Sequence, residues 1–348
     1  MYPKVAIIIL NWNGWKDTIE CLESLYQINY PNYNVIVVDN GSEDESIEKI
    51  KEYCEGEMEV ESKFFEYSSE NKPIKIIEYT REEAEVGGGK EEEIMDLPSN
   101  RKLILIKNEK NYGFAEGNNI GMRYALKASN PDYVLLLNND TVVDPEFLGE
   151  LVKVAESDGE IGIVGPKIYY YDEPRRLWAP CDQKSVGKID DGRRNDIREV
   201  KLVVGCAFFV KASVIDKVGL LDPDLFLYGE ENDYCIRVEK AGYKLYFSHS
   251  SIIWHKTSLQ GNLLKPYQVY YSCRNSIILR RKNYPDIRFY SSLFRYFLID
   301  MPLYALRLLK SSRYNPIILT PMLKGIKDGF LWCLGIVQAG KNKYIKLR

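Results

Sequence analysis

The chain has 348 residues, enough for one large domain or two modest ones, and its hydrophobic fraction of 45% argues against a disordered protein. Its seven cysteines are scattered and form no CxxC pair, which argues against a disulfide framework or a zinc site and favours a reducing compartment. The net charge is −3, but residues 280–348 hold 14 Lys and Arg against 3 Asp and Glu, so the acidic excess lies in the rest of the chain.

Apolar strands alternate with helices in the first half of the chain. The segment VAIIIL (5–10) runs straight into NWNG, so we interpret it as a buried strand and not as the apolar part of a signal peptide. This alternation predicts an α/β fold with a mostly parallel sheet covered by helices on both faces. The further elements are strands at 34–39, 102–107 and 133–138 and helices near 16–27, 43–54 and 115–128.

Polar side chains stand at or just past the ends of these strands: Asn11, Asp39, Asn108 and Asn138. Ligands of parallel sheets bind at the carboxyl ends of the strands, so we expect these residues in one site. The carboxylate of Asp39 could accept a hydrogen bond from a pyrimidine ring N–H or a ribose hydroxyl. The alternative for Asp39 is an Asx turn or a helix N-cap within DNGS.

Residues 55–100 interrupt this rhythm, with 14 Asp and Glu against 5 Lys and Arg. We interpret the segment as an acidic and partly mobile surface insertion that could contain a strand at 74–79. Two roles stay open for it, namely a solvated excursion without chemistry and a regulatory or partner-binding element.

Two acidic motifs carry the chemistry. LLLNNDT (135–141) predicts a buried strand that ends in a polar turn, where a lone carboxylate, that of Asp140, could hold a divalent cation. FLYGEENDYCIR (226–237) places Glu230, Glu231 and Asp233 within four positions, and a carboxylate there could take a proton. Together they meet the needs of an enzyme that moves a group off a pyrophosphate.

Six motifs follow one another along residues 4–285 in an order that resembles a known family. They are IIILNWNG, VVDNGSEDES, NYGFAEGNNIG, LLLNNDTVV, the segment 204–245 that includes FLYGEENDYCIR, and WHKTS. The chain resembles the family 2 glycosyltransferases of the GT-A fold, closest to the rhamnosyltransferase-like and galactofuranosyltransferase-like members. The resemblance implies a GT-A domain over residues 1–285, interrupted by the acidic insertion at about 55–100.

The resemblance implies a nucleotide-sugar donor, such as dTDP-rhamnose, UDP-galactofuranose or another UDP-sugar. Asp39 reads the base in similar enzymes, and Leu10 and Trp12 lie on the loop that packs against it, although Trp12 could equally be a core residue. The glycines of NYGFAEGNNIG let backbone approach a ligand, and the helix start that they precede favours phosphate. Many relatives carry an arginine where Asn118 stands. The residues expected to bind the donor are Leu10, Trp12, Asp39, Gly113, Asn118, Asn138 and Asn139.

The resemblance also implies a metal site. LLLNND is similar to the DxD motif of GT-A enzymes with Asn138 in place of the first acid, which implies that Asp140 binds Mn²⁺ or Mg²⁺. His255 in WHKTS matches the histidine that completes this site in relatives, and an imidazole suits Mn²⁺ better. The alternative for His255 is a structural histidine at a strand end, and we interpret His249 as structural.

Glu231 stands at the position of the catalytic base in the family, where the common residue is aspartate. The resemblance implies that Glu231 deprotonates an acceptor hydroxyl in a single displacement that inverts the anomeric configuration. The alternative is a carboxylate that merely favours the start of a helix through its dipole, which suits Glu230 and Asp233 well.

Two other classes of protein were weighed. A nucleotidyltransferase usually carries a glycine-rich loop with Lys or Arg after the first strand, and NWNGWKDT lacks this pattern. A non-catalytic sugar-nucleotide-binding protein would not need both Asp140 and Glu231. These comparisons favour a glycosyltransferase that acts on a saccharide or lipid-linked saccharide, as in polysaccharide or glycan assembly.

The C-terminal region, residues 286–348, is basic, apolar and aromatic. Its segments 293–309 and 316–337 are too short and too charged for an ordinary spanning helix. The composition predicts a helical extension on an anionic membrane surface and not a nucleic-acid-binding arm, with the protein cytoplasmic and peripheral at the inner face of the cell membrane. Alternatively, these helices cover the catalytic core or form a contact in a homo-oligomer.

Overall fold

The computed structural model describes residues 2–179, 186–190, 192, 197–257, 265–284, 286–303, 306 and 319–336. The chain divides into two compact units. The first comprises Met1–Leu221 and Tyr234–Thr257, and the second comprises Asp222–Asp233 and Ser258–Arg348. The expected domain boundary near residue 285 stays a prediction.

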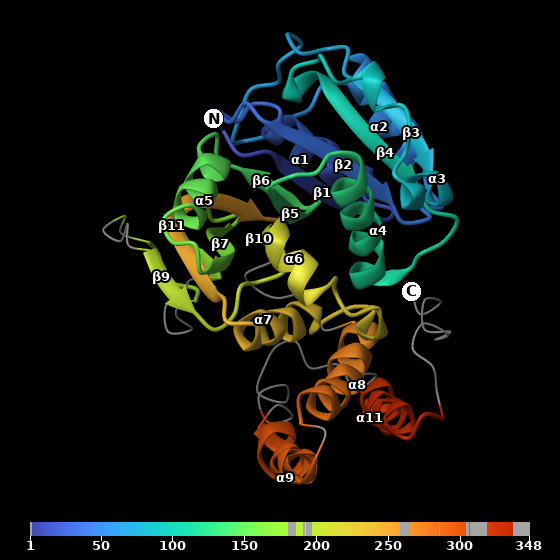
Figure 1. Cartoon of the computed structure of the whole chain (residues 1–348), viewed down its shortest axis with the longest axis vertical. Coiled ribbons are helices and arrows are strands. Elements are labelled where there is room, and N and C mark those ends of the chain that lie inside the picture. The colour runs from blue at the N-terminus through green and yellow to red at the C-terminus, as the bar shows by residue number, and fades with distance from the viewer. Residues whose placement is uncertain are drawn as a thin grey trace. The chain divides into compact units, whose positions relative to one another are not determined.

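An 11-stranded sheet forms the centre of the first unit (Figure 1). Its order is β3-β4-β2-β1-β5-β10-β7-β11-β6, and β8 and β9 pair with β7 and β11. The strands from β3 to β5 are all parallel, as predicted, whereas β10 runs antiparallel to both of its neighbours. The strands are β1 (Val5–Asn11), β2 (Tyr33–Asp39), β3 (Lys75–Thr80), β4 (Lys102–Lys107), β5 (Tyr133–Asn138), β6 (Thr141–Val143), β7 (Ile161–Tyr170), β8 (Leu177–Ala179), β9 (Ile197–Val200), β10 (Ala207–Lys211) and β11 (Lys244–His255).

Helices cover both faces of this sheet, which explains why its strands are apolar without interruption. Successive residues of β1 point to opposite faces, so Ile7 joins one apolar core and Ile8 joins the other. On the face of Ile7 lie α1 (Trp15–Leu25), α2 (Ser46–Glu55) and α5 (Phe147–Ala155). On the face of Ile8 lie α3 (Arg81–Val86), α4 (Gly113–Ala128), α6 (Ala212–Val218) and the later turns of α7 (Glu230–Lys240).

The acidic segment 55–100 is more than a surface excursion. Its strand β3 pairs with β4 in parallel and forms the edge of the sheet. Lys72 makes an ion pair of 3.0 Å with Glu23 of α1, and their side chains are only 4% and 0% exposed. Removing one partner of such a buried ion pair would destabilise the protein, because the remaining charge would be buried without a partner. The segment is therefore anchored to the core at both the strand and the ion pair.

The second unit consists of helices. These are α8 (Pro266–Asn283), α9 (Ile287–Arg295), a π-helix (Tyr296–Asp300) and α11 (Leu319–Cys333), with the short helix Pro223–Leu225 and the first turn of α7. Helices α8 and α11 lie side by side (Figure 1), and two glycines of α11 permit the close approach. A Cβ atom on Gly325 would lie 2.4 Å from the carbonyl oxygen of Tyr270, and one on Gly329 would lie 2.8 Å from that of Arg274.

The predicted C-terminal helices are thus confirmed where the structure describes them, whereas residues 304–305, 307–318 and 337–348 of the extension lie outside the described ranges. Within those ranges, no helix combines the length and the apolar character needed to cross a bilayer. Six cysteines are described and are free thiols, and Cys181 lies outside the described residues.

Candidate functional site

The carboxyl ends of the parallel strands meet at one edge of the sheet, as predicted. The register places Asn11 of β1 opposite Asp39 of β2 and Leu10 opposite Asn138 of β5. Lys107 lies opposite Asp39, which brings the following residue, Asn108, to the same edge. Parallel pairing of strands with similar lengths is the physical reason that residues so distant in the sequence converge here.

Asp39 is a buried hydrogen-bonding hub. Its Oδ2 accepts from Asn11 Nδ2 at 2.7 Å and from Ser42 Oγ at 2.6 Å, while its Oδ1 accepts from the backbone N–H of Ser42 at 2.9 Å. The bond to the Ser42 N–H spans three residues, one more than in an Asx turn, and α2 begins only at Ser46, so neither alternative for this residue describes the arrangement. A contact between Asp39 and a nucleotide base stays a prediction, and lone-pair capacity remains on Oδ1 for it.

Trp12 lies on the loop after β1 and is 43% exposed, so the alternative that it is an ordinary core residue is wrong. Leu10 is half-buried at the end of β1 and packs against the core on the α4 side. The two residues therefore present one exposed indole and one apolar side chain near the strand edge. Their contact with a base stays a prediction.

The segment NYGFAEGNNIG enters α4 at Gly113, which has a φ of +85° that suits glycine. The Gly113 carbonyl accepts from Asn40 Nδ2 at 3.2 Å, and Asn40 Oδ1 accepts from Asn108 Nδ2 at 3.1 Å. Asn40 was not among the predicted residues, although it follows Asp39 directly. This amide network fixes the start of α4 beside the strand edge.

The other two glycines of this segment serve packing within the protein. A Cβ atom on Gly117 would lie 2.6 Å from Cδ1 of Leu10, and one on Gly121 would lie 2.7 Å from Cγ2 of Ile8. They let α4 approach β1 closely. Asn118 is buried and donates from Nδ2 to the Phe114 carbonyl in its own helix at 2.9 Å, so its predicted contact with the donor would require a rotation of its side chain.

The turn after β5 holds Asn138, Asn139 and Asp140. The Asn138 carbonyl accepts from the Thr141 hydroxyl at 2.7 Å, which closes the turn. Asn139 Nδ2 donates to the hydroxyl of Thr18 at 3.0 Å and so ties the turn to α1. The predicted roles of both asparagines toward the donor stay predictions.

Asp140 and His255 are brought together by the pairing of β6 with β11. His255 lies opposite Thr141 in this antiparallel pair, and the N–H of Lys256 donates to the Asp140 carbonyl at 2.9 Å. As a result, Nε2 of His255 lies 3.2 Å from Oδ1 of Asp140. The Trp178 ring lies 4.5 Å from the imidazole and covers it, a neighbour that the sequence did not indicate.

This pair fits a divalent cation. Apart from its approach to Nε2 of His255, Asp140 Oδ1 is a buried atom without a hydrogen-bond partner among the residues that the structure describes. Two ligands on neighbouring corners of an octahedral ion at about 2.1 Å are about 3 Å apart, close to the observed separation. Within the described ranges no group of three His, Cys, Asp or Glu residues gathers, so water or a ligand would have to supply the other positions.

In the second unit, an unusual loop leads into the acidic start of α7. Phe226 and Tyr228 have φ values of +61° and +69°, which non-glycine residues rarely adopt, and Gly229 follows at +94°. The N–H of Leu227 donates to the Leu225 carbonyl at 2.6 Å, which makes a γ-turn around Phe226. Each such non-glycine residue costs ~1–3 kcal/mol, so the surrounding contacts must hold the loop in this shape.

Glu230 and Glu231 follow this loop and share one environment. Oε2 of Glu231 accepts from the backbone N–H of Gly229 at 3.2 Å. Burial raises the pKa of Glu231, although the Gly229 N–H opposes part of this change. Burial and the neighbouring charge of Glu231 raise the pKa of Glu230 well above its usual range. Glu230 therefore holds a proton more firmly than Glu231, which leaves Glu231 as the member of the pair that ionises first.

A residue that the sequence did not indicate supports this loop. The Nδ2 of Asn275 in α8 lies 2.7, 2.9 and 2.7 Å from the carbonyl oxygens of Leu225, Leu227 and Tyr228, and its two N–H groups donate to these three acceptors, one of them shared. The available signal was the pair Arg274–Asn275 within the mostly apolar and aromatic run YYSCRNSIIL, because large polar side chains that become buried require partners.

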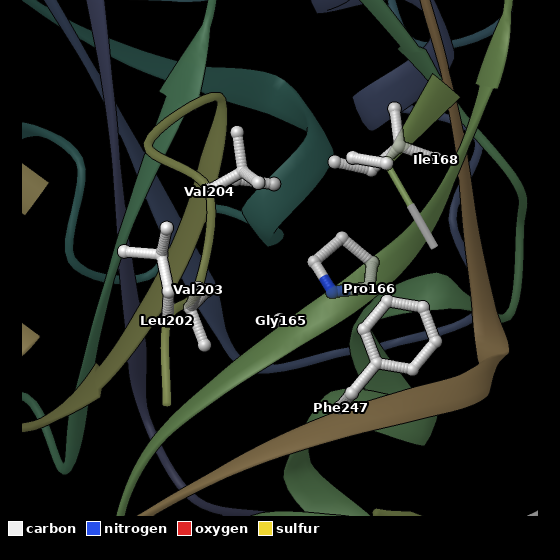
Figure 2. Close-up of a pocket in the computed structure, with 9 residues that line it drawn as sticks. Gly165, Pro166, Ile168, Leu202, Val203, Val204 and Phe247 are labelled. Carbon is white, nitrogen blue, oxygen red and sulfur yellow. The ribbon is translucent and has the colours of Figure 1, made fainter. Parts of the chain in front are cut away.

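Two cavities of the first unit lie apart from the predicted residues. The cavity in Figure 2 has a volume of about 40 Å³, near that of a single water molecule, and apolar residues such as Pro166, Val203 and Phe247 line it. His249 packs edge-to-face against Phe247 at 4.8 Å, in line with a structural role. The second has about 290 Å³ and is lined by polar residues that include Asn71 and Arg101, near the start of β4. None of the predicted site residues lines either cavity.

Comparison with known proteins identifies the family. Residues 6–77 match the family described as Glycosyl transferase family 2, and residues 91–264 match Glycosyltransferase like family 2. The low-salt glycan biosynthesis hexosyltransferase Agl10 of Haloferax volcanii is 25% identical over 193 residues, and the dTDP-rhamnosyl transferase RfbF of Shigella flexneri is 24% identical over 195 residues. Each alignment covers 53% of this chain, and the chain spans only 62% and 64% of these relatives.

Solved structures share the fold. The mannosyltransferase PcManGT of Pyrobaculum calidifontis aligns with a TM-score of 0.55 and 14% identity, over 99% of this chain and 88% of that one. TarS 1-349 of S. aureus aligns with a TM-score of 0.52 and 10% identity, over 96% and 83%. The predicted GT-A fold is thus confirmed. Because the match to residues 91–264 alone covers half of the sequence, the chain belongs to glycosyltransferase family 2.

Proposed function

We propose that this chain is an inverting, metal-dependent glycosyltransferase. It moves a sugar from a UDP- or dTDP-linked donor to a hydroxyl of a saccharide or a lipid-linked saccharide. The observation that carries the proposal is the Asp140–His255 pair beside the strand edge, with 3.2 Å between the buried Oδ1 of Asp140 and Nε2 of His255, two atoms that suit one cation. The names of Agl10 as a hexosyltransferase and RfbF as a dTDP-rhamnosyl transferase support the choice of donors.

Asp140 and His255 would hold Mn²⁺ or Mg²⁺, and PcManGT, which shares the fold, was solved with GDP-Man and Mn²⁺. When bound, the cation supplies positive charge for the diphosphate leaving group. Asn138 stands where the DxD motif has its first acid, and its amide carries no negative charge. The donor's phosphate oxygens would therefore complete the coordination, so that metal and donor bind together.

Glu231 would act as the general base. The acceptor hydroxyl oxygen attacks the anomeric carbon and forms the new glycosidic bond, while the bond from that carbon to the diphosphate oxygen breaks. The hydroxyl proton passes to the Glu231 carboxylate, and the electron pair of the broken bond leaves with the nucleoside diphosphate. Attack from the face opposite the leaving group inverts the anomeric configuration. Glu230, whose pKa burial and the neighbouring Glu231 raise well above its usual range, is the weaker candidate for this role.

The test is turnover with a panel of donors. The purified chain would be incubated with dTDP-rhamnose, UDP-galactofuranose and other UDP-sugars, with Mn²⁺ or Mg²⁺ and saccharide acceptors. Release of nucleoside diphosphate that stops in excess EDTA is expected. Donor binding without release of nucleoside diphosphate would support a sugar-nucleotide-binding protein instead. Release of pyrophosphate from a nucleoside triphosphate and a sugar phosphate would support a nucleotidyltransferase.

Helix α9 supports the further proposal of a peripheral association with the anionic inner face of the cell membrane. Ile287, Tyr290 and Phe294 are 77%, 66% and 69% exposed, and their spacing places them on one side of the helix. Arg288 and Arg295 lie on the same helix, within a C-terminal region that is strongly basic. Exposed apolar side chains next to basic ones are typical of helices that lie in a membrane interface.

Replacing Tyr290 and Phe294 together with serine is expected to release the protein from anionic vesicles. Burying one large apolar side chain contributes about 1.5–3 kcal/mol, so the loss of two should weaken binding at least 100-fold. Flotation with phosphatidylserine-containing vesicles at low and high salt measures the change. Substitution suits this test better than truncation near residue 285, because truncation would uncover Val269, Cys273 and Ile277 of α8.

The matched control is Val86→Ser in the first unit, an equally exposed apolar residue that should leave flotation unchanged. If the unaltered protein fails to float at low salt, the membrane proposal is wrong. A dimeric mass that becomes monomeric in the Tyr290 and Phe294 variant would then assign this side of α9 to a homo-oligomer contact.

A further inference from the structure

The loop before α7 needs an external support. Phe226 and Tyr228 both occupy the left-handed region of backbone conformation without being glycine. Non-glycine residues rarely adopt a positive φ, so a loop without outside contacts would relax toward negative φ values. Whatever holds the loop also determines where the residues that follow it, Glu230 and Glu231, are placed.

Asn275 provides that support through a side chain of fixed orientation. The residue is 2% exposed, and its Oδ1 accepts from Nη1 of Arg274 at 2.8 Å. The guanidinium group can only donate, so the amide nitrogen of Asn275 must face the other way, toward the loop. There it reaches three carbonyl oxygens of the loop, and Arg274 adds a bond to the Asp224 carbonyl at 3.0 Å.

The helix that carries Asn275 is itself a firm base. Gly325 and Gly329 of α11 bring that helix against the backbone of α8 at Tyr270 and Arg274. The ring of Phe226 also stacks on Tyr271 of α8, with 5.1 Å between the ring centres. The loop is therefore fastened to α8 by hydrogen bonds and by an aromatic contact.

One peptide group links Asn275 directly to Glu231. The carbonyl of Tyr228, which accepts from Asn275 at 2.7 Å, belongs to the same peptide unit as the N–H of Gly229. That N–H donates to Oε2 of Glu231 at 3.2 Å. Because a peptide unit is planar and rigid, a rotation that released the carbonyl from Asn275 would also turn the N–H away from Glu231. Hydrogen bonds in such a chain also strengthen one another.

We propose that Asn275 is a positioning residue for the glycosyl transfer, acting through the Tyr228–Gly229 peptide to place and tune the Glu231 carboxylate. The inference rests on the proposed function, in which Glu231 is the general base. Asn275 touches neither donor nor acceptor in this role. Its effect should therefore appear in turnover and in its pH dependence, and not in the affinity for the donor.

Asn275→Ala and Asn275→Asp are expected to lower kcat at least 10-fold with an unchanged KM for the donor. The aspartate variant keeps the shape but can no longer donate to the three carbonyls. The Gly229 N–H holds the pKa of Glu231 below the level that burial alone would set. Losing this bond should move the acid limb of the pH–rate profile to higher pH, a change that a partly unfolded enzyme would not show.

The control is Asn283→Ala on the same helix, whose amide donates to the Leu279 carbonyl of α8 at 3.0 Å. It should keep the wild-type kcat and pH profile. Hydrogen exchange of the Leu227 and Gly229 amides, measured without any substrate, should be faster in Asn275→Ala only. If Asn275→Ala does not fold, the double variant Asn275→Ala with Tyr228→Gly is used, because glycine adopts the positive φ of position 228 without strain. Its kcat is then compared with that of the single variant Tyr228→Gly.

Two outcomes separate this inference from the function on which it rests. If Glu231→Gln is inactive but both Asn275 variants keep the wild-type kcat and acid limb, the positioning role is wrong and the proposed function stands. If the unaltered chain transfers no sugar from any donor of the panel, and Glu231→Gln binds the donors with the same affinity as the unaltered chain, the proposed function itself fails.

Discussion

Replacing Glu231 with glutamine is expected to lower kcat about 100-fold or more while donor affinity is retained. Glutamine has the same size and can still accept from the Gly229 N–H, but it cannot take a proton from the acceptor hydroxyl. Loss of a general base typically lowers a rate by 10²–10⁴. Initial rates of nucleoside diphosphate release give kcat, and calorimetric titration with the donor gives its affinity.

The pH dependence offers an independent check on the same residue. Burial raises the pKa of Glu231, and the base acts only when it is ionised. Activity should therefore rise with pH through a limb that lies above the usual glutamate pKa of about 4.3. Glu231→Gln should lack this limb. A variant that loses donor binding as much as turnover would mark Glu231 as a binding or structural residue instead.

Replacing Asp140 with alanine is expected to abolish both transfer and metal-dependent donor binding. The substitution removes the only carboxylate of the pair that suits the cation, and a lone imidazole binds Mn²⁺ or Mg²⁺ weakly. His255→Ala should weaken both activities without abolishing them, because the carboxylate remains. Donor titrations in Mn²⁺ and in excess EDTA, together with the electron paramagnetic resonance signal of free Mn²⁺, measure the two effects separately.

Asp172→Ala is the matched control, because its carboxylate is 84% exposed and makes a long ion pair of 3.8 Å with Lys63. It should bind Mn²⁺ and donor as the unaltered chain does. Full activity of the unaltered chain in excess EDTA would contradict the assignment of a metal to Asp140 and His255.

The local elements of the parallel half could be read from the sequence. Strands buried on both faces must be apolar throughout, so VAIIIL, KLILIK and YVLLLN predicted β1, β4 and β5 almost to the residue. Parallel strands end at a common edge, and for this reason the convergence of Asn11, Asp39 and Asn138 could also be predicted. The acidic motifs indicated Asp140 as a candidate, and the family resemblance added His255 and singled out Glu231 among its neighbouring acids. The roles of all three stay predictions.

Only the tertiary structure decided which partners these residues have. The approach of His255 to Asp140 depends on the antiparallel pairing of β6 with β11, and no local pattern specifies which of two distant strands lie together. The same holds for Gly117, where the space that a side chain would need is occupied by Leu10. Asn275 is the clearest case, because its partners are backbone carbonyls, and every residue of the chain carries one. A sequence therefore shows that a buried asparagine needs partners, whereas the packing of α8 against the loop determines which carbonyls it holds.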